Sequence, residues 1–137
     1  MQAFRDVATA AYCPRKLYYR QRAADPDADV PDVVRKRRAL AFRYPELLAD
    51  DDALAEAPLA VTPTQFRSRL SCTKARLDDW AALADPPGRD VYLEGLDCRG
   101  VAHKVLEDPP RPSLVFAGDP PERGVWEPQS VRLVAAA

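Results

Sequence analysis

The sequence contains few of the residues that usually build a metal site or a disulfide framework. Its 137 residues include three cysteines and a single histidine. Cys13, Cys72 and Cys98 are odd in number and far apart, which argues against the disulfides of a small secreted protein. Because no Cys-x-x-Cys pair occurs, the sequence shows no complete metal or cluster site.

Long apolar runs are absent as well. No stretch approaches the roughly 18 apolar residues that a membrane-spanning helix needs. The N-terminus also lacks the basic and then apolar pattern of a secretory signal. We therefore expect a cytoplasmic protein without a membrane partner. The length and a hydrophobic content of 47% predict one globular domain.

Charge is distributed unevenly along a chain whose net charge is −1. Residues 1–43 carry a net charge of +5, so residues 44–137 carry −6. This asymmetry predicts a one-sided surface that suits a polyanion, although a solvated helix face produces the same pattern. The ten basic residues of the front segment are Arg5, Arg15, Lys16, Arg20, Arg22, Arg35, Lys36, Arg37, Arg38 and Arg43.

The segment AYCPRKLYYRQR, residues 11–22, combines a cysteine, basic residues and two adjacent tyrosines, Tyr18 and Tyr19. From these residues alone, Cys13 is a buried structural thiol, a metal or cluster ligand, or part of a nucleic-acid surface. Arginine and lysine can neutralise phosphates, and tyrosine rings can stack on bases. The basic residues of the segment are Arg15, Lys16, Arg20 and Arg22.

Several segments have the pattern of helices. Residues 3–22 are expected to form two pieces, the second starting at Pro14, and 23–32 to form a loop. Residues 33–49 are expected to be helical with a break at Pro45.

The clearest helix is predicted over 63–84. Thr62 and Gln65 have the spacing of a capping box, and Pro63 suits the first helical position. The preceding run, 49–58, is expected to be a loop or a poorly packed helical end. One apolar stripe of the helix contains Phe66, Leu70, Leu77, Trp80 and Ala84.

The pattern then changes to that of strands, predicted over 90–97, 99–107 and 112–118. A last helix is predicted over 127–137. Because that segment ends in apolar residues without a glycine or asparagine stop, we expect a longer domain cut short at its C-terminus. A genuine terminus that frays is the alternative.

The segment YCPRKLYY, Tyr12–Tyr19, resembles the N-terminal signature of the CRISPR-associated RecB-like exonucleases, the fourth-numbered Cas family. The order of helices, three strands and a helix that begins near GVWEP resembles the core of those nucleases. The resemblance implies an α/β fold of the PD-(D/E)XK nuclease type, with a helical part in 1–89 and a β-β-β-α core in 90–137. It also implies metal-dependent trimming of DNA ends during spacer acquisition, together with CRISPR adaptation proteins.

The family carries a [4Fe–4S] cluster and uses Mg²⁺ or Mn²⁺. By resemblance, Cys13 is the first cluster ligand, and three more cysteines would follow near the C-terminus. This sequence has no such trio, and Cys72 and Cys98 do not match the family positions. Since a cluster normally takes four thiolates, we expect an incomplete cluster site.

The catalytic positions of the family also differ in this sequence. Its aspartate corresponds to His103, and its Glu-x-Lys pair corresponds to Leu114 and Phe116. Mg²⁺ prefers several oxygen ligands, which one imidazole cannot replace, so we expect no metal-dependent cleavage. His103 is either a weak metal ligand or an ordinary strand histidine. The nearby acids Asp97, Glu107 and Asp108 either substitute for the missing ligands or are plain loop carboxylates.

Four functions are compatible with the sequence. It is an inactive relative of the CRISPR exonucleases, a DNA-binding or scaffold module on that fold, a DNA-repair nuclease relative outside CRISPR systems, or a gene remnant. The second function requires Tyr18 and Tyr19 at the surface, because a core position would remove them from the basic residues. The expected DNA-binding residues are Arg15, Lys16, Arg20, Arg22, Arg35, Arg37 and Arg38, with Tyr18 and Tyr19.

Overall fold

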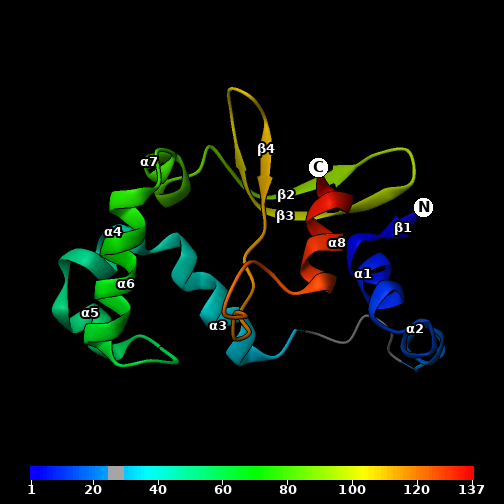
Figure 1. Cartoon of the computed structure of the whole chain (residues 1–137), viewed down its shortest axis with the longest axis horizontal. Coiled ribbons are helices and arrows are strands. Elements are labelled where there is room, and N and C mark those ends of the chain that lie inside the picture. Colours follow the sequence, from blue (N-terminus) through cyan, green and yellow to red (C-terminus); the bar gives the residue numbers. More distant parts are fainter. Residues whose placement is uncertain (25–29) are drawn as a thin grey trace. The chain divides into compact units, whose positions relative to one another are not determined.

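The computed structural model describes residues 1–24 and 30–137, which group into two compact units (Figure 1). The first unit comprises the described residues of 1–29, 87–114 and 118–137. The second comprises 30–86 and 115–117. Half of the loop expected over 23–32, residues 25–29, lies outside the described residues.

The first unit is a mixed α/β structure in which a small four-stranded sheet is packed with helices. The N-terminal helices precede three of the strands, and the C-terminal helix packs against the first helix. This arrangement agrees with the α/β class expected from the sequence. The elements are β1 (Gln2–Ala3), α1 (Phe4–Tyr12), α2 (Pro14–Gln21), β2 (Gly88–Glu94), β3 (Cys98–Leu106), β4 (Arg111–Ser113) and α8 (Glu127–Ala136).

Strand β3 is the centre of the sheet. It pairs antiparallel with β2, from Gly88 opposite Val105 to Glu94 opposite Arg99. Its other edge is shared, because β1 pairs with its start in parallel and β4 pairs with its end in the antiparallel direction. The sequence predicted the β2–β3 hairpin, but β4 is shorter than the strand expected over 112–118.

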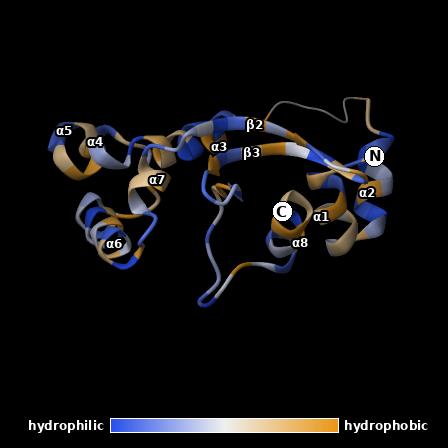
Figure 2. Ribbon diagram, turned by 90° about the horizontal axis from the view of Figure 1, so that it is seen from above, coloured by the Kyte–Doolittle hydropathy of each residue, from blue (hydrophilic) through white to orange (hydrophobic). Residues whose placement is uncertain are grey.

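One face of the sheet packs against α1 and α8, which lie on the same side of it (Figure 2). Phe4 at the start of α1 is 3% exposed, and its ring lies directly over Gly100 of β3. A Cβ atom on Gly100 would stand 2.2 Å from Cδ2 of that ring, so the packing requires a glycine at this position. Ala102, two residues further along the strand, is fully buried.

Cys13 separates α1 from α2. Its backbone is extended, with φ −162° and ψ 106°, and it serves as the N-cap of α2. The proline that follows disfavours a helical conformation at Cys13 and supplies the first residue of the new helix. The predicted division of 3–22 into two helical pieces, the second starting at Pro14, is therefore confirmed.

The second unit consists of short helices around an apolar cluster. Leu40, Leu47 and Leu54 form the buried centre, and Phe66 packs against it. The elements are α3 (Asp32–Ala39), a 3₁₀ turn (Leu40–Phe42), α4 (Tyr44–Ala49), α5 (Asp51–Glu56), α6 (Pro63–Arg76) and α7 (Trp80–Ala84).

Two helix predictions are corrected in this unit. The segment 49–58, expected as a loop or frayed end, contains α5, whose N-cap Asp50 accepts hydrogen bonds from two backbone N–H groups. Leu54 is 4% exposed, so burial of this one side chain stabilises the short helix. The helix expected over 63–84 is two helices, because α6 ends at Arg76 and α7 begins at Trp80. Leu77, which was expected on the apolar stripe, lies between them and is 43% exposed.

The start of α6 agrees with the sequence. Gln65 N–H donates to Thr62 Oγ1, and Thr62 N–H donates to the Gln65 side chain, which completes the predicted capping box. Among the helices of the described ranges, none is both long and apolar enough to cross a bilayer.

Candidate nucleic-acid interface

Helix α2 presents aromatic and basic side chains to solvent. Tyr18 and Tyr19 are 49% and 58% exposed, and Tyr12 at the end of α1 is 68% exposed. Exposed aromatic side chains that lie close together are a feature of binding surfaces. We call the surface formed by Tyr12, Arg15, Lys16, Tyr18, Tyr19 and Arg22 the α2 surface.

Each tyrosine of the α2 surface has a cation close to its ring. The guanidinium carbon of Arg22 lies 4.2 Å from the centre of the Tyr18 ring. The Lys16 ammonium lies 5.4 Å from the centre of the Tyr12 ring. Arg15 and Tyr19 form the third pair, at 5.7 Å. The Arg15–Tyr19 pair within α2 and the Tyr18–Arg22 pair at its end have a spacing of four residues, which brings side chains together on a helix, whereas the Tyr12–Lys16 pair spans the α1–α2 junction.

The electrostatics and the ring geometry define what this surface can bind. Helix α2 contains no acidic residue, so its positive charge is not offset within the helix. The Tyr18 and Tyr19 rings meet edge to face, with an interplanar angle of 81°. Two bases that stack on these rings must therefore be splayed apart, which a single strand permits and a duplex resists.

Arg20 is in a different environment from the other basic residues of α2. Its Nη2 atom lies 3.4 Å from Asp6 Oδ1, and its Nη1 atom donates to Thr9 Oγ1 at 3.1 Å. Both partners belong to α1, so the Arg20 guanidinium is engaged within the protein. It is not part of the α2 surface.

The basic residues of α3 belong to the second unit, whereas the α2 surface belongs to the first. Arg35 forms an ion pair with Asp32 at 2.8 Å, and Lys36 contacts the same carboxylate at 3.0 Å. Hydrogen bonds from Lys36 and then Arg35 lower the pKa of the Asp32 carboxyl below its ordinary value. Arg37 donates to the Ala117 carbonyl at 3.5 Å, and Arg38 is half-buried. The expected DNA-binding residues are therefore divided between two units.

The cysteines do not form a set that could hold an iron–sulfur cluster. Cys13 is half-exposed at the α1–α2 junction, Cys98 begins β3, and Cys72 lies exposed on α6 in the second unit. In residues 1–24 and 30–137, no group of three or more His, Cys, Asp or Glu side chains is arranged to hold a metal ion. The described residues thus fit neither a [4Fe–4S] cluster nor a magnesium site, and the role of Cys13 as a ligand stays a prediction.

The positions expected to match the nuclease motifs are not grouped on one strand pair. His103 is 8% exposed on β3. Strand β4 ends at Ser113, so Leu114 and Phe116 lie beyond the strand that we expected to carry them. Of the nearby acids, Asp97 lies in the hairpin turn, and the exposed Glu107 and Asp108 follow β3.

Lys104 is a buried charged residue that the sequence analysis missed. It is 2% exposed on β3 and pairs with Arg89 of β2 and Ser113 of β4. Burial, and then the positive charge of Arg89, lowers the pKa of Lys104 to about 8. Side chains alternate between the two faces of a strand, so Lys104 lies on the same face of β3 as Ala102 and Leu106. This alternation was the sequence signal that could have predicted its burial.

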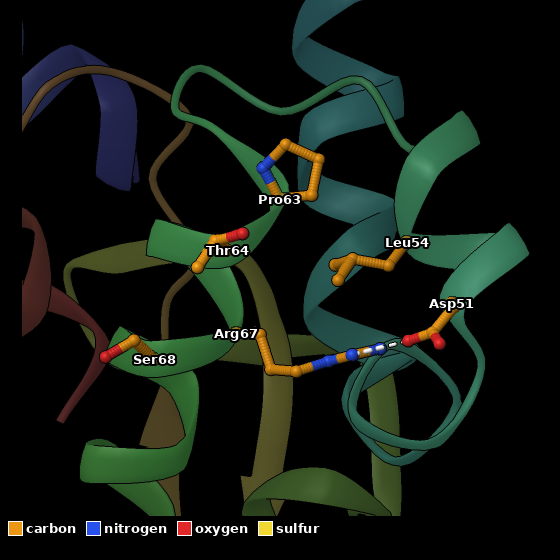
Figure 3. A pocket seen from close by; sticks show the side chains of 6 residues that line it. All are labelled: Asp51, Leu54, Pro63, Thr64, Arg67 and Ser68. Carbon is orange, nitrogen blue, oxygen red and sulfur yellow. Dashed lines mark hydrogen bonds and ion pairs between the residues drawn. The ribbon is translucent and has the colours of Figure 1, made fainter.

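A cavity of about 440 Å³ lies in the second unit at the first turns of α5 and α6 (Figure 3). Arg67 of α6 reaches toward Asp51 of α5 and forms an ion pair with it. Because the cation and the carboxylate balance each other, this cavity presents no net charge to a ligand. The α2 surface is the stronger candidate site. The cavity is lined by Asp51, Leu54, Pro63, Thr64, Arg67 and Ser68.

Comparison with known proteins adds no relative. No protein-family model matches the chain, and no curated protein or solved structure is significantly similar to it. The resemblance to the CRISPR-associated exonucleases rests on the segment Tyr12–Tyr19 and on the order of helices and strands.

Proposed function

We propose that this chain is a nucleic-acid-binding module that binds single-stranded or end-containing DNA through the α2 surface and does not cleave it. The observation that carries the proposal is the exposure of Tyr12, Tyr18 and Tyr19, each with a cation near its ring. Exposed rings beside cations combine the two contacts that bind single strands without sequence preference.

The α2 surface supports a definite mode of binding. Arg15, Lys16 and Arg22 neutralise phosphates, while the exposed tyrosine rings accept unstacked bases. Three phosphate contacts on a single strand give a salt slope of about −2. The affinity then falls by about 20-fold between 50 and 200 mM salt.

We further propose that the module is related to the CRISPR-associated RecB-like exonucleases and acts beside CRISPR adaptation proteins in spacer acquisition. The signature at the α1–α2 junction and the order of β2, β3, β4 and α8 support this relation. The residues His103, Leu114 and Phe116 offer no carboxylate for Mg²⁺, which supports binding without cleavage. A DNA-repair context would use the same surface.

The test is direct titration of the full chain with a fluorescent single-stranded oligothymidine, followed by anisotropy at 50 and 200 mM salt. We expect salt-sensitive binding, with a matched duplex bound more weakly. No binding at 50 mM salt would disprove the proposed function. Incubation with Mn²⁺ is expected to leave the DNA intact, and Mn²⁺-dependent degradation that is lost in His103→Ala would contradict the absence of cleavage.

A further inference from the structure

Helix α2 is attached to the first unit by few apolar contacts. None of its eight residues is buried, and Leu17 is a half-buried apolar side chain among them. The backbone link to α1 is the extended residue Cys13. An element with so little apolar burial needs another contact to hold its orientation.

A polar cluster between α1 and α2 provides that contact. Arg20 reaches from the last turn of α2 to Asp6 and Thr9 of α1. The Thr9 hydroxyl also donates to the Arg5 carbonyl at 2.8 Å, and the Thr9 carbonyl accepts the Cys13 N–H at 2.8 Å. The side chains of Arg20 and Asp6 are 29% and 23% exposed, so the ion pair is partly sheltered from solvent.

We infer that Asp6, Thr9 and Arg20 form a clamp that fixes α2 against α1 and so pre-orients the α2 surface for nucleic acid. The inference rests on the proposed function. Arg20 is then a positioning residue that acts through the orientation of α2, without touching the phosphates. If the clamp is lost, α2 can move about Cys13, and binding must order the helix at a cost in affinity.

Substitution of Asp6 distinguishes the clamp from simple charge attraction, because the two explanations predict opposite changes in DNA affinity. Asp6→Asn removes a negative charge near a basic surface, so charge attraction alone predicts tighter binding of DNA. The clamp predicts the opposite, because the Arg20 guanidinium loses its ionic partner. We expect Asp6→Asn to bind the fluorescent oligothymidine about three- to tenfold more weakly than the wild-type chain. Equal or tighter binding would overturn the inference.

Substitution of Arg20 tests whether it contacts phosphate. Arg20→Met is expected to weaken binding by the same factor as Asp6→Asn while leaving the salt slope unchanged. A direct phosphate contact would instead reduce the slope by about 0.7. The exchanged pair Asp6→Arg with Arg20→Asp should restore most of the affinity, and Arg20→Lys should be intermediate because an ammonium makes fewer fixed contacts.

Asp51→Asn is the matched control. This substitution also removes the carboxylate of an ion pair, the one between Asp51 and Arg67. Both residues belong to the second unit. We expect its affinity for the oligothymidine to equal that of the wild-type chain. A loss equal to that of Asp6→Asn would show that any broken ion pair has this effect, and would overturn the inference.

Hydrogen exchange supplies a measurement that does not depend on binding. In Asp6→Asn and Arg20→Met, the α2 amides of 17–21 should exchange faster than in the wild-type chain, while β3 amides keep their protection. Unchanged α2 exchange would overturn the clamp. If the wild-type chain binds no DNA but α2 exchange still rises in both variants, the proposed function fails, and the attachment of α2 by the clamp stands alone.

Discussion

Tyr18 illustrates how a single residue carries the candidate function. Its ring is half-exposed and has the Arg22 guanidinium close by, while its neighbour Tyr19 meets it edge to face. The pairing of tyrosine with a cation four residues away is visible in the sequence, since it depends on helix spacing alone. The role of Arg20 is not visible there, because it depends on the packing of α2 against α1.

The first prediction concerns that ring. Tyr18→Ala should weaken binding of the single-stranded oligothymidine at least fivefold, because stacking of one base is worth about 1–3 kcal/mol. Anisotropy titration at 50 mM salt measures the change. Tyr92→Ala is the control, since Tyr92 is 54% exposed on β2 and lies outside the α2 surface. An equal loss of affinity in both variants would contradict base stacking on Tyr18 as the explanation of binding.

A second prediction at the same scale concerns charge. Arg22→Gln should weaken binding and also make the salt slope shallower by about 0.7, because one phosphate contact is lost. Titrations at four salt concentrations between 50 and 200 mM measure the slope. Arg76→Gln removes a charge from the end of α6, and its slope should match that of the wild-type chain. An unchanged slope for Arg22→Gln would exclude it from phosphate contact.

At the scale of elements, local signals predicted helix starts better than strand ends or short helices. Pro14, Thr62 and Pro63 act through their immediate neighbours, and the structure confirms the helix starts that they predict. Helix α5 was missed because its stability depends on Leu54, which is buried against residues distant in the chain. Strand β1 has only two residues and pairs with β3, so no periodic pattern could reveal it.

The packing of α1 on β3 gives a prediction for stability. Gly100→Ala should lower the free energy of unfolding by about 1–3 kcal/mol, because the added methyl group overlaps the Phe4 ring. Urea unfolding followed by circular dichroism measures the loss. Gly95→Ala in the same hairpin is the control, since its Cβ would meet its nearest atom at 3.7 Å, an ordinary contact distance. Similar stability of the two variants would contradict this account of the packing.

At the scale of the whole molecule, the burial of Lys104 couples stability to pH. Its pKa is about 8 in the folded protein, below the ordinary 10.5, so folding disfavours the protonated amine. Below pH 8 the amine is protonated in both states, and the full cost of burying the charge is present. As the pH rises above 8, the folded state loses the proton while the unfolded state keeps it, and that cost disappears.

The free energy of unfolding should therefore rise by about 2 kcal/mol between pH 7.5 and 9.5. Urea unfolding at pH 7.5, 8.5 and 9.5 measures the rise. Burial raises the pKa of Tyr44, which lowers stability above pH 10, so the window ends below that pH. Lys104→Met should abolish the rise, whereas Lys36→Met, at an exposed lysine, should keep it. A flat profile in the wild-type chain would contradict the lowered pKa of Lys104.

The sequence by itself determined the two helices α1 and α2, the break between them at Cys13, the capping box at Thr62 and the β2–β3 hairpin. These features depend on proline geometry, side-chain caps and alternation, which act over a few residues. Only the tertiary structure decided that Lys104 is buried, that Arg20 contacts Asp6, and that Tyr18 and Tyr19 face solvent. These outcomes depend on which segments distant in the chain pack together, and local pattern does not encode that information.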